Sequence, residues 1–476
     1  MANREPFYGK FLKKEPLKQT RRPLERSSAV QSQRQAAEDT DAVSIAAHTG
    51  RKRKQVSLKR SIPYTFGDPV FSELSSDAKQ ILSDIPVILK TVLPLDSKKQ
   101  QALSLHIHEL FHELTDQRSS RRTHYLNDPV KLFAYIHYYF WWNLVRLVKL
   151  LQNIPLLLKD GDRAADFGTG PLTFICALWI AKPELRKQQL TWYCVDISHK
   201  ALTIGEEIFL SLCSYTARNF DKDEKPWHIK KIGGSFGVLL KEKVALITEA
   251  NMFNELFWNN PLPVEVQAKK THETLMQYLK PDGSVLLIEP GIPLAGEFLS
   301  MLRTLFLQSG FSVPQPCPHA GACCFPYRKP RSEHSGKQTA IPIAAGKWCH
   351  FTFMTDDSPP QLLSLSQAAR LGKEKASLSF FYCSAAKAQQ SVSAEQSAIA
   401  GTDDIPARIC SDIITPAPQI IGRYACSKYG FMLITTPAYR ESVLNKAVSG
   451  SLLFIPEQQF ISGKRDKKTG AVLVEL

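Results

Sequence analysis

The sequence contains no hydrophobic run long enough to span a lipid bilayer. The longest such run, residues 132–145, has 14 residues and includes His137 and Asn143, whereas a membrane-spanning helix needs about 20 apolar residues. The first residues lack the apolar segment of a secretory signal, and three glutamates among residues 5–25 interrupt the basic run expected of a mitochondrial transit peptide. We therefore expect no membrane segment and a cytoplasmic protein, with the mitochondrial matrix as the alternative.

Acidic residues are scarce relative to basic ones. The chain has 60 Lys and Arg against 45 Asp and Glu, a net charge of +15. Residues 1–60 alone hold 15 Lys and Arg and 6 Asp and Glu, a net +9, with few large apolar side chains. This composition is typical of a disordered basic arm that binds a polyanion, most readily nucleic acid, through its phosphates. The other interpretation of the arm is a solvated tail without a function.

Because we expect no export signal, we expect the ten cysteines to be reduced rather than paired in disulfides. Four of them, in the last third of the chain, are candidate metal ligands: Cys317, Cys323, Cys349 and Cys426. The first two lie in PCPHAGACCFP (316–326), where proline and glycine exclude a helix or a central strand. Four thiolates from separate loops can bind a tetrahedral Zn²⁺ or a 4Fe–4S cluster. Free cysteines also pack as small apolar side chains, and the spacing alone does not decide between these roles.

A chain of 476 residues is long enough for two or three domains. After the arm, residues 61–160 show apolar residues at helical spacing in 78–93 and 128–152, and Asp128 followed by Pro129 is a helix start. The aromatic residues between 135 and 142 are better explained by packing than by stacking on RNA bases.

Residues 161–310 alternate short apolar strands with helices, which predicts an α/β domain with a doubly wound parallel sheet. The expected strands are 163–168, 190–196, 243–248 and 283–290, and the expected helices are 171–184 and the segment after Ser198. Residues 311–476 are less regular and hold the cysteine loop, the remaining sheet strands near 376–384 and 429–436, and a small β extension that ends in a pair of short strands.

The turn after the first expected strand is a candidate cofactor site. In ADFGTGPLTF, Gly168 and Gly170 let the backbone approach a ligand closely on either side of Thr169, while position 173 lacks the glycine of a dinucleotide fingerprint. Asp166 before the glycines and Asp196 at the end of the next strand fit S-adenosylmethionine better. The first carboxylate can bind the methionine ammonium and the second the ribose hydroxyls. The alternative is a tight turn that binds no ligand.

Five segments occur in an order that resembles a known family. They are ADFGTGP (165–171), EANMFNEL (249–256), LIEPGIPLAGEF (287–298), CPHAGAC (317–323) and WCHF (348–351). Together they resemble the methyltransferase-like small-ribosomal-subunit assembly proteins of mitochondria and many bacteria, over roughly residues 63–440. The resemblance implies a class I (Rossmann-like) methyltransferase fold that binds S-adenosylmethionine, association with the small ribosomal subunit and its RNA, and a 4Fe–4S cluster. It places the cluster ligands on Cys317, Cys323, Cys349 and Cys426, with zinc as the alternative metal.

The chain departs from the family pattern at two positions. Leu172 stands where the family usually has a third glycine, so the cofactor approach is tighter or lost. Cys324 is an additional thiol next to Cys323, which leaves open which of the two binds the metal. His319 and His350 neighbour the expected ligands; they are expected to be ordinary loop histidines, although an orienting role is the alternative.

Several known methyltransferase motifs are missing. The chain has neither an Asn-Pro-Pro-Tyr motif of base N-methylation nor the paired cysteines of cytosine C5 attack, and the C-x3-C-x2-C motif of radical enzymes is absent. Asn254 and Glu255 lie where many methyltransferases contact substrate, but helix capping explains them equally well. We assign no catalytic residue. The sequence thus predicts a monomeric RNA methyltransferase, or a non-catalytic assembly factor that keeps the fold and the cluster. A zinc-stabilised DNA-binding protein fits the charge and the cysteines only.

Overall fold

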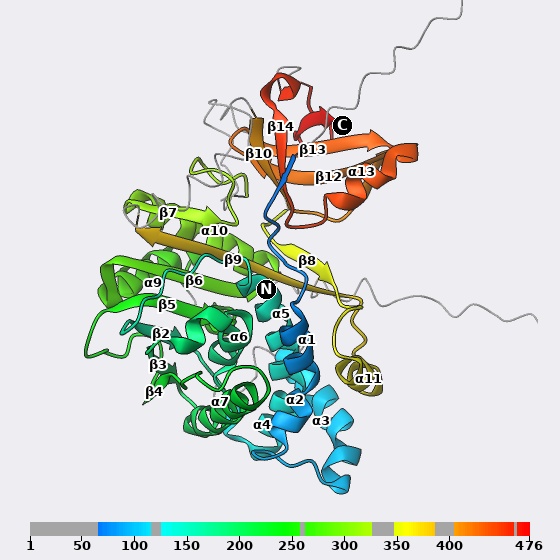
Figure 1. The fold of residues 1–476 in the computed structure, drawn as a ribbon. Coiled ribbons are helices and arrows are strands. Elements are labelled where there is room, and N and C mark those ends of the chain that lie inside the picture. Colours follow the sequence, from blue (N-terminus) through cyan, green and yellow to red (C-terminus); the bar gives the residue numbers. More distant parts are fainter. Residues whose placement is uncertain (1–64, 116–124, 258–261, 326–346, 386–403, 461–463) are drawn as a thin grey trace, which may run out of the picture. The chain divides into compact units, whose positions relative to one another are not determined.

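The structure, a computed structural model, describes residues 65–115, 125–257, 262–325, 347–385, 404–460 and 464–476 (Figure 1). The predicted basic arm, residues 1–60, lies outside these ranges. The described strands form one eight-stranded and one seven-stranded sheet. Among the described residues, no helix combines the length and the apolar character needed to cross a membrane.

The N-terminal region is helical, as predicted. Asp128 caps one of its helices: the carboxylate accepts hydrogen bonds from the N–H groups of Val130 (2.9 Å) and Lys131 (3.3 Å), and Pro129 is the first helical residue. The helical elements are α1 (Ser76–Ser83), α2 (Ile85–Leu89), α3 (Ser97–Thr115), η2 (Tyr125–Asn127), α4 (Pro129–Ala134), the π-helical turn η3 (Tyr135–Phe140) and α5 (Trp141–Leu151).

The aromatic run of this region is part of the core. Trp141 and Trp142 are buried, and each indole N–H has a partner: Trp141 donates to the Leu82 carbonyl at 2.8 Å and Trp142 to the Ser366 hydroxyl at 3.0 Å. A satisfied indole N–H is what burial of a tryptophan requires. The packing interpretation of these residues is therefore confirmed.

The eight-stranded sheet is parallel except at one strand. Its order along the sheet is β4 (His228–Gly233), β3 (Thr191–Asp196), β2 (Arg163–Phe167), β5 (Val244–Ala250), β6 (Leu279–Pro290), β9 (Lys375–Ala385) and β7 (Phe311–Gln315). The additional strand β8 (Phe351–Met354) pairs with β9, and β9 is antiparallel to β6, β7 and β8. The strands predicted within residues 161–310 are confirmed, and β9 is the strand predicted near 376–384, although its antiparallel insertion was not predicted. The strand predicted near 429–436 belongs to the seven-stranded sheet instead.

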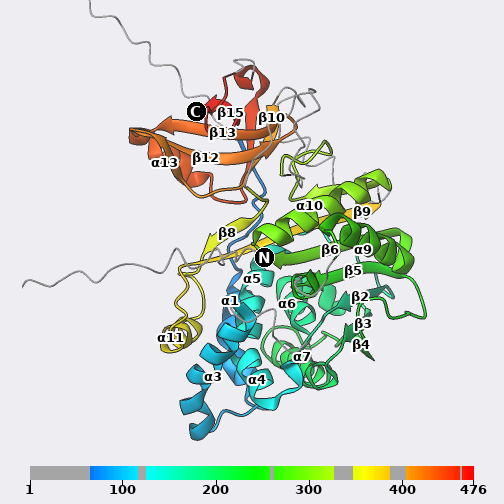
Figure 2. The same cartoon turned by 180° about the vertical axis from the view of Figure 1, so that it is seen from behind.

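Helices cover both faces of this sheet (Figures 1 and 2). Alternate strand residues belong to different clusters: Ala164 packs with the N-terminal helices, whereas its neighbour Ala165 packs on the opposite face. The doubly wound architecture is thus confirmed. The remaining described helices around the sheet are α6 (Thr173–Ala181), η4 (Pro183–Lys187), α7 (His199–Asn219), α8 (Phe253–Phe257), α9 (Val264–Tyr278), α10 (Pro293–Gln308) and α11 (Pro360–Ala368).

The seven-stranded sheet is larger than the predicted β extension. Its order is β1 (Thr65–Gly67), β14 (Leu452–Pro456), β10 (Asp404–Ile409), β12 (Ile420–Ser427), β13 (Gly430–Pro437) and β15 (Val472–Glu475), with β11 (Ile414–Ala417) beside β12. Three short elements follow β13: η6 (Ala438–Arg440), α13 (Glu441–Lys446) and, after β14, η7 (Glu457–Phe460). The expected terminal strand pair is reduced to one bridge between Arg465 and Val472, because β15 pairs in parallel with β13 instead.

Candidate functional site

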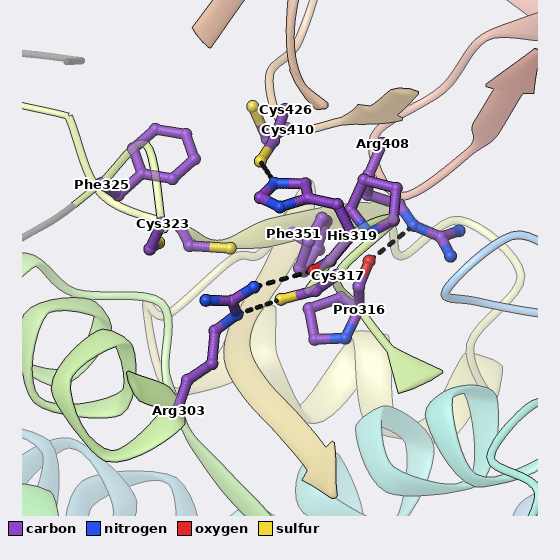
Figure 3. Close-up of a pocket in the computed structure, with 12 residues that line it drawn as sticks. Arg303, Pro316, Cys317, His319, Cys323, Phe325, Phe351, Arg408, Cys410 and Cys426 are labelled. Atoms are coloured by element: carbon purple, nitrogen blue, oxygen red, sulfur yellow. Dashed lines mark hydrogen bonds between the residues drawn. The ribbon is translucent and has the colours of Figure 1, made fainter. Parts of the chain in front are cut away.

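The four predicted cysteines line one cavity with about 330 Å³ of atom-free space, part of it open to solvent (Figure 3). Cys317 and Cys323 lie in the loop after β7, and Cys349 precedes β8. Cys426 comes from β12 of the other sheet, so both sheets contribute to the cavity. A fifth thiol, Cys410, also lines it, and the sequence did not single out this residue.

The thiol next to Cys323 occupies a different place. Cys323 lines the cavity, whereas Cys324 is fully buried, does not line it and lies against Cys426. The contact with Cys324, joined by His319, lowers the pKa of the Cys426 thiol well below its usual range. A thiol with a lowered pKa is readily deprotonated, and thiolates are the form that binds metal. Burial has the opposite effect on Cys317 and raises its pKa to about 11.

Arg303 organises the cysteine loop from α10. Its Nε donates to the Sγ of Cys317 at 2.9 Å, and its Nη2 donates to the carbonyls of His319 (2.8 Å) and Gly321 (2.9 Å). Only 3% of the residue is exposed. The sequence reasoning missed this residue, although a charged side chain between Leu299 and Phe306 on the apolar face of a helix is a visible signal.

Arg408 is a second buried guanidinium at the cavity. Its Nε donates to the Pro316 carbonyl at 3.0 Å, and its Nη1 donates to the carbonyls of Asp68 (2.7 Å) and Gly450 (2.9 Å). The first of these bonds joins β10 to the start of the cysteine loop. Among the described residues, neither Arg303 nor Arg408 forms an ion pair with a carboxylate, so two buried cations face the thiols. Buried charges are costly unless opposite charge is nearby.

The two histidines of the cysteine segments behave differently. His319 Nε2 lies 3.3 Å from the Sγ of Cys426, so this ring touches an expected ligand. His350 stacks on Trp348 with ring centroids 4.9 Å apart, and its Nδ1 is 3.2 Å from the Trp348 carbonyl. His350 therefore matches the expected loop histidine, whereas His319 is positioned to orient a thiol.

The spacing of these groups does not match a single bound ion. Within the described ranges, no three His, Cys, Asp or Glu side chains come close enough together to bind one metal ion. A polynuclear cluster places its protein ligands further apart than one tetrahedral ion does, because each thiolate binds a different iron. The choice between zinc and a 4Fe–4S cluster stays a prediction from the sequence.

Four of the five predicted cofactor residues line a second cavity at the carboxyl ends of β2 and β5, with about 280 Å³ of atom-free space, part of it open to solvent. Asp166, Gly168, Thr169 and Gly170 all contribute to its wall. The sheet order reverses between these two strands, and open α/β sheets bind ligands at such switch points. The cavity is further lined by residues that the sequence reasoning did not name as cofactor ligands: Tyr135, Asn143, Thr173, Phe174, Ala250 and Asn251.

The two predicted acidic residues are held by hydrogen bonds. Asp166 is buried and accepts from the hydroxyls of Thr169 and Thr248, the second at 2.7 Å. Burial raises the pKa of Asp166 to about 7 in spite of these bonds. Asp196, outside the cavity wall, accepts from the N–H groups of Gly170 and Ser198, both at 2.8 Å. Asp196 therefore fixes the glycine turn from behind.

Leu172 adopts a left-handed backbone conformation, which favours glycine. Its φ of 55° and ψ of 37° are left-handed, a region that costs a residue with a side chain about 1 kcal/mol or more. The side chain is fully buried, and a Cβ at Gly205 of α7 would lie 2.4 Å from the Pro171 carbonyl carbon. Close packing of α7 on the turn thus holds Leu172 in place.

Two buried glutamates lie at the ends of the central strands β5 and β6. Glu249 accepts hydrogen bonds from the N–H groups of Met252 and Phe253, and Glu289 accepts from the N–H of Asn254 at 3.1 Å. Asn254 is buried and does not line the cofactor cavity, so its backbone role is structural. Burial raises the pKa of both carboxyl groups, and the charge of Glu289 raises that of Glu249 further.

Glu289→Gln should make the stability of the protein depend less on pH. Both folded-state pKa values lie above the unfolded value near 4.5, so folded protein keeps protons that the unfolded chain releases. Stability therefore falls as the pH rises from about 4.5 towards 8. The amide oxygen still accepts the hydrogen bond from the Asn254 N–H. We expect the decrease in the free energy of unfolding across this pH window to be smaller than in the wild type by about 1–3 kcal/mol. Urea unfolding between pH 5 and 8 measures this effect, and Glu273→Gln, at an exposed position, is the control. An unchanged slope of unfolding free energy against pH would contradict the prediction.

The sheet order, with an antiparallel strand inserted next to the last parallel one, and the acidic residues around the glycine turn define a class I methyltransferase-like fold. Residues 162–423, more than half of the chain, match the family described as mitochondrial small ribosomal subunit Rsm22. The chain belongs to the Rsm22 family. The resemblance inferred from the five sequence segments is thereby confirmed.

Solved structures with a similar fold include several methyltransferases. One from Clostridium acetobutylicum is 18% identical with a TM-score of 0.21, over 34% of this chain and 54% of its own. Another, from Thiobacillus denitrificans in complex with S-adenosyl-L-homocysteine, is 14% identical with a TM-score of 0.25, over 51% and 91%. Fibrillarin from Aeropyrum pernix, with natively bound S-adenosyl-L-methionine, is 16% identical with a TM-score of 0.23, over 37% and 69%.

These similarities carry no argument about activity, because every TM-score is below 0.3. The chain spans about half the length of the Clostridium protein. No curated protein sequence matches the chain.

Proposed function

We propose that this protein binds S-adenosylmethionine and acts on or with the RNA of the small ribosomal subunit, as a methyltransferase-like factor in ribosome assembly. The observation that carries the proposal is the cavity at the switch point of the sheet, lined by Asp166 and both glycines of the turn. Membership of a small-subunit family supports the ribosomal partner. The family description also supports the mitochondrial alternative over the expected cytoplasmic location.

The acidic residues suit the two polar ends of the cofactor. Asp166 is buried with a pKa near neutrality, so a methionine ammonium bound beside it would favour the ionised carboxylate. Asp196 is the proposed partner of the ribose hydroxyls. Its two oxygens accept hydrogen bonds from the N–H groups of Gly170 and Ser198, and a carboxylate oxygen can accept more than one hydrogen bond.

We further propose a 4Fe–4S cluster with Cys317, Cys323, Cys349 and Cys426 as ligands. The fit is supported by the donor set, four thiols from separate segments around one cavity. It is also supported by charge: four thiolates around such a cluster leave a net negative charge, and Arg303 and Arg408 are buried cations without carboxylate partners among the described residues. The cluster would join the two sheets, because Cys426 belongs to the second one.

A non-catalytic assembly factor is the second candidate. Leu172 at the third glycine position and the engaged oxygens of Asp196 favour it, since both restrict the approach of a ligand to the turn. No side chain lining the cavity is assigned as a catalytic base. Transfer of a tritiated methyl group from S-adenosylmethionine to small-subunit RNA distinguishes the two: incorporation supports the enzyme, and binding without incorporation supports the factor.

Asp166→Asn should weaken S-adenosylmethionine binding about ten- to hundredfold, because a charge-assisted hydrogen bond to the ammonium is lost. Isothermal titration calorimetry of the full chain measures this, and Asp282→Asn, an exposed change on β6, is the matched control. Equal affinity of Asp166→Asn and wild type would contradict the assigned role. Absence of binding to the wild type at millimolar ligand would remove the cofactor proposal and leave family membership unaffected.

A further inference from the structure

The C-terminal strands have the connectivity of an oligonucleotide-binding barrel. Strand β10 pairs antiparallel with both β12 and β14, β12 pairs antiparallel with β13, and β15 pairs in parallel with β13. Helix α13 lies between β13 and β14 in the chain (Figures 1 and 2). This is the Greek-key order of a five-stranded OB-fold, in which a helix separates the third and fourth strands. The short strand β1 extends the sheet beside β14.

The barrel has its own apolar interior. Side chains of β12 and β13 alternate between this interior and the outer face. Ala425 and Met432 pack inside with Leu444 of α13. Tyr424 and Phe431 lie on the outer side and stack on each other, with ring centroids 4.8 Å apart and an interplanar angle of 20°. Phe431 is buried, whereas Tyr424 remains partly exposed. The outer face of the second and third strands is the surface with which OB-folds bind oligonucleotides.

A basic loop adjoins the Tyr424 ring. The loop between β14 and β15 carries four exposed cationic side chains: Lys464, Arg465, Lys467 and Lys468. Within the described residues, none of these four forms an ion pair with a carboxylate. The acidic residue among them, Asp466, accepts from the N–H (2.8 Å) and hydroxyl (2.5 Å) of Thr469, and both residues lie beside the Tyr424 phenol.

The exposed Lys347 adds a cation on the other side, with its Nζ 5.7 Å from the Tyr424 ring centroid. An aromatic ring flanked by unpaired cations is the combination that binds single-stranded nucleic acid: bases stack on the ring and phosphates contact the cations. Bases within a duplex are already stacked on each other, so a ring on the protein surface does not reach them. Charge complementarity thus favours a polyanion, and the ring favours one with free bases.

We propose that the barrel binds single-stranded RNA, with one base stacked on Tyr424 and the adjacent phosphates on the 464–468 loop and Lys347. A bound base stacks on the ring face that Lys347 now covers, and the Lys347 ammonium then contacts a phosphate. The choice of RNA over DNA rests on the proposed small-subunit partnership. The surface and its preference for single strands do not depend on methyl transfer.

Photocrosslinking of the full chain locates the contact directly. A 15-nucleotide oligoribonucleotide with 4-thiouridine is irradiated with the wild-type protein, and crosslinked peptides are identified by mass spectrometry. We expect crosslinks at Tyr424 and in residues 464–470. Crosslinks confined to residues 1–60 or to the eight-stranded sheet would overturn the proposal, and would leave the S-adenosylmethionine titration to decide the proposed function separately.

Fluorescence anisotropy with the same oligonucleotide measures how much each group contributes to the binding affinity. Tyr424→Ile, which keeps apolar bulk without a ring, should weaken binding about tenfold, and Tyr424→Phe should stay within about twofold of wild type. Replacing all four loop cations by serine should lower the slope of log affinity against log salt concentration by up to about 3 in magnitude. The matched control is the serine substitution of four other exposed lysines outside the barrel: Lys222, Lys241, Lys269 and Lys270.

Two results would contradict the barrel as the binding surface. One is an equal loss of affinity in the loop and control variants, which would show that only net charge matters. The other is equal affinity of the wild type for a duplex of the same length. The loop side chains are exposed and form no ion pair with a carboxylate among the described residues, so the loop variant is expected to fold. An unchanged melting temperature verifies this.

Discussion

Serine at Cys317, Cys349 or Cys426 should bleach a protein that is brown when purified without oxygen. Thiolate-bound iron–sulfur clusters absorb broadly near roughly 400 nm, and a hydroxyl is a poor ligand for iron compared with a thiolate. All three side chains line the same cavity. Cys323→Ser should have the same effect. The measurement is the visible spectrum with iron and sulfide content, on protein purified anaerobically.

The remaining thiols provide the controls for this experiment. Cys324→Ser should keep the colour, because this side chain does not line the cavity, and so should Cys213→Ala in α7. Cys410 does line the cavity, so Cys410→Ser tests the assignment most directly. If it bleaches the protein while Cys323→Ser does not, the ligand set is wrong. Colourless protein with one equivalent of zinc would refute iron, and protein with neither metal would refute the whole site.

Arg303→Met should release the cysteine loop from α10 and lose most of the cluster. The variant leaves the carbonyls of His319 and Gly321 without their donor and removes the cation next to Cys317. Each buried acceptor without a partner costs about 1–3 kcal/mol, so we expect a destabilisation of about 2–5 kcal/mol in total. Thermal unfolding and iron content measure the two effects.

Two further variants separate the contributions of Arg303. Arg303→Lys keeps the charge but not the fork of donors, so it should retain more iron than the methionine variant. Cluster that remains in Arg303→Met should have a lower reduction potential, because a nearby cation stabilises the more negative reduced state. Arg218→Met, at an exposed position of α7, is the control. A methionine variant with wild-type stability and potential would show that Arg303 does not support the site.

The elements that could be predicted from the sequence are those whose signal is local. Gly168 and Gly170 after an apolar strand mark the cofactor cavity, and Asp196, 28 positions after Gly168 at the end of the next strand, accepts a hydrogen bond from the Gly170 N–H. The cysteine loop was equally visible from its prolines and glycines. That these cysteines bind metal stays a prediction, as does the cofactor role of the aspartates.

The missed features depend on partners that are distant in the chain. Arg408 bonds to Pro316, 92 positions earlier, and no local pattern indicates that partner. The barrel was missed for the same reason: β10 lies between β12 and β14, and a sequence shows its strands but not their pairing. Similarly, nothing within residues 375–385 specifies that β9 inserts antiparallel between β6 and β7.

The late position of β9 has a consequence for the protein during its synthesis. Strand β6 ends at Pro290 and β7 at Gln315, but β9, which pairs with both, begins only at Lys375. Ribosomes add about 5–20 residues per second, so the 85 residues from the end of β6 to the start of β9 leave the edge of β6 unpaired for about 4–17 s. An apolar strand edge exposed for seconds is a template for aggregation. The nascent chain should therefore depend on chaperones during this interval, after most of the cofactor cavity has already been synthesised.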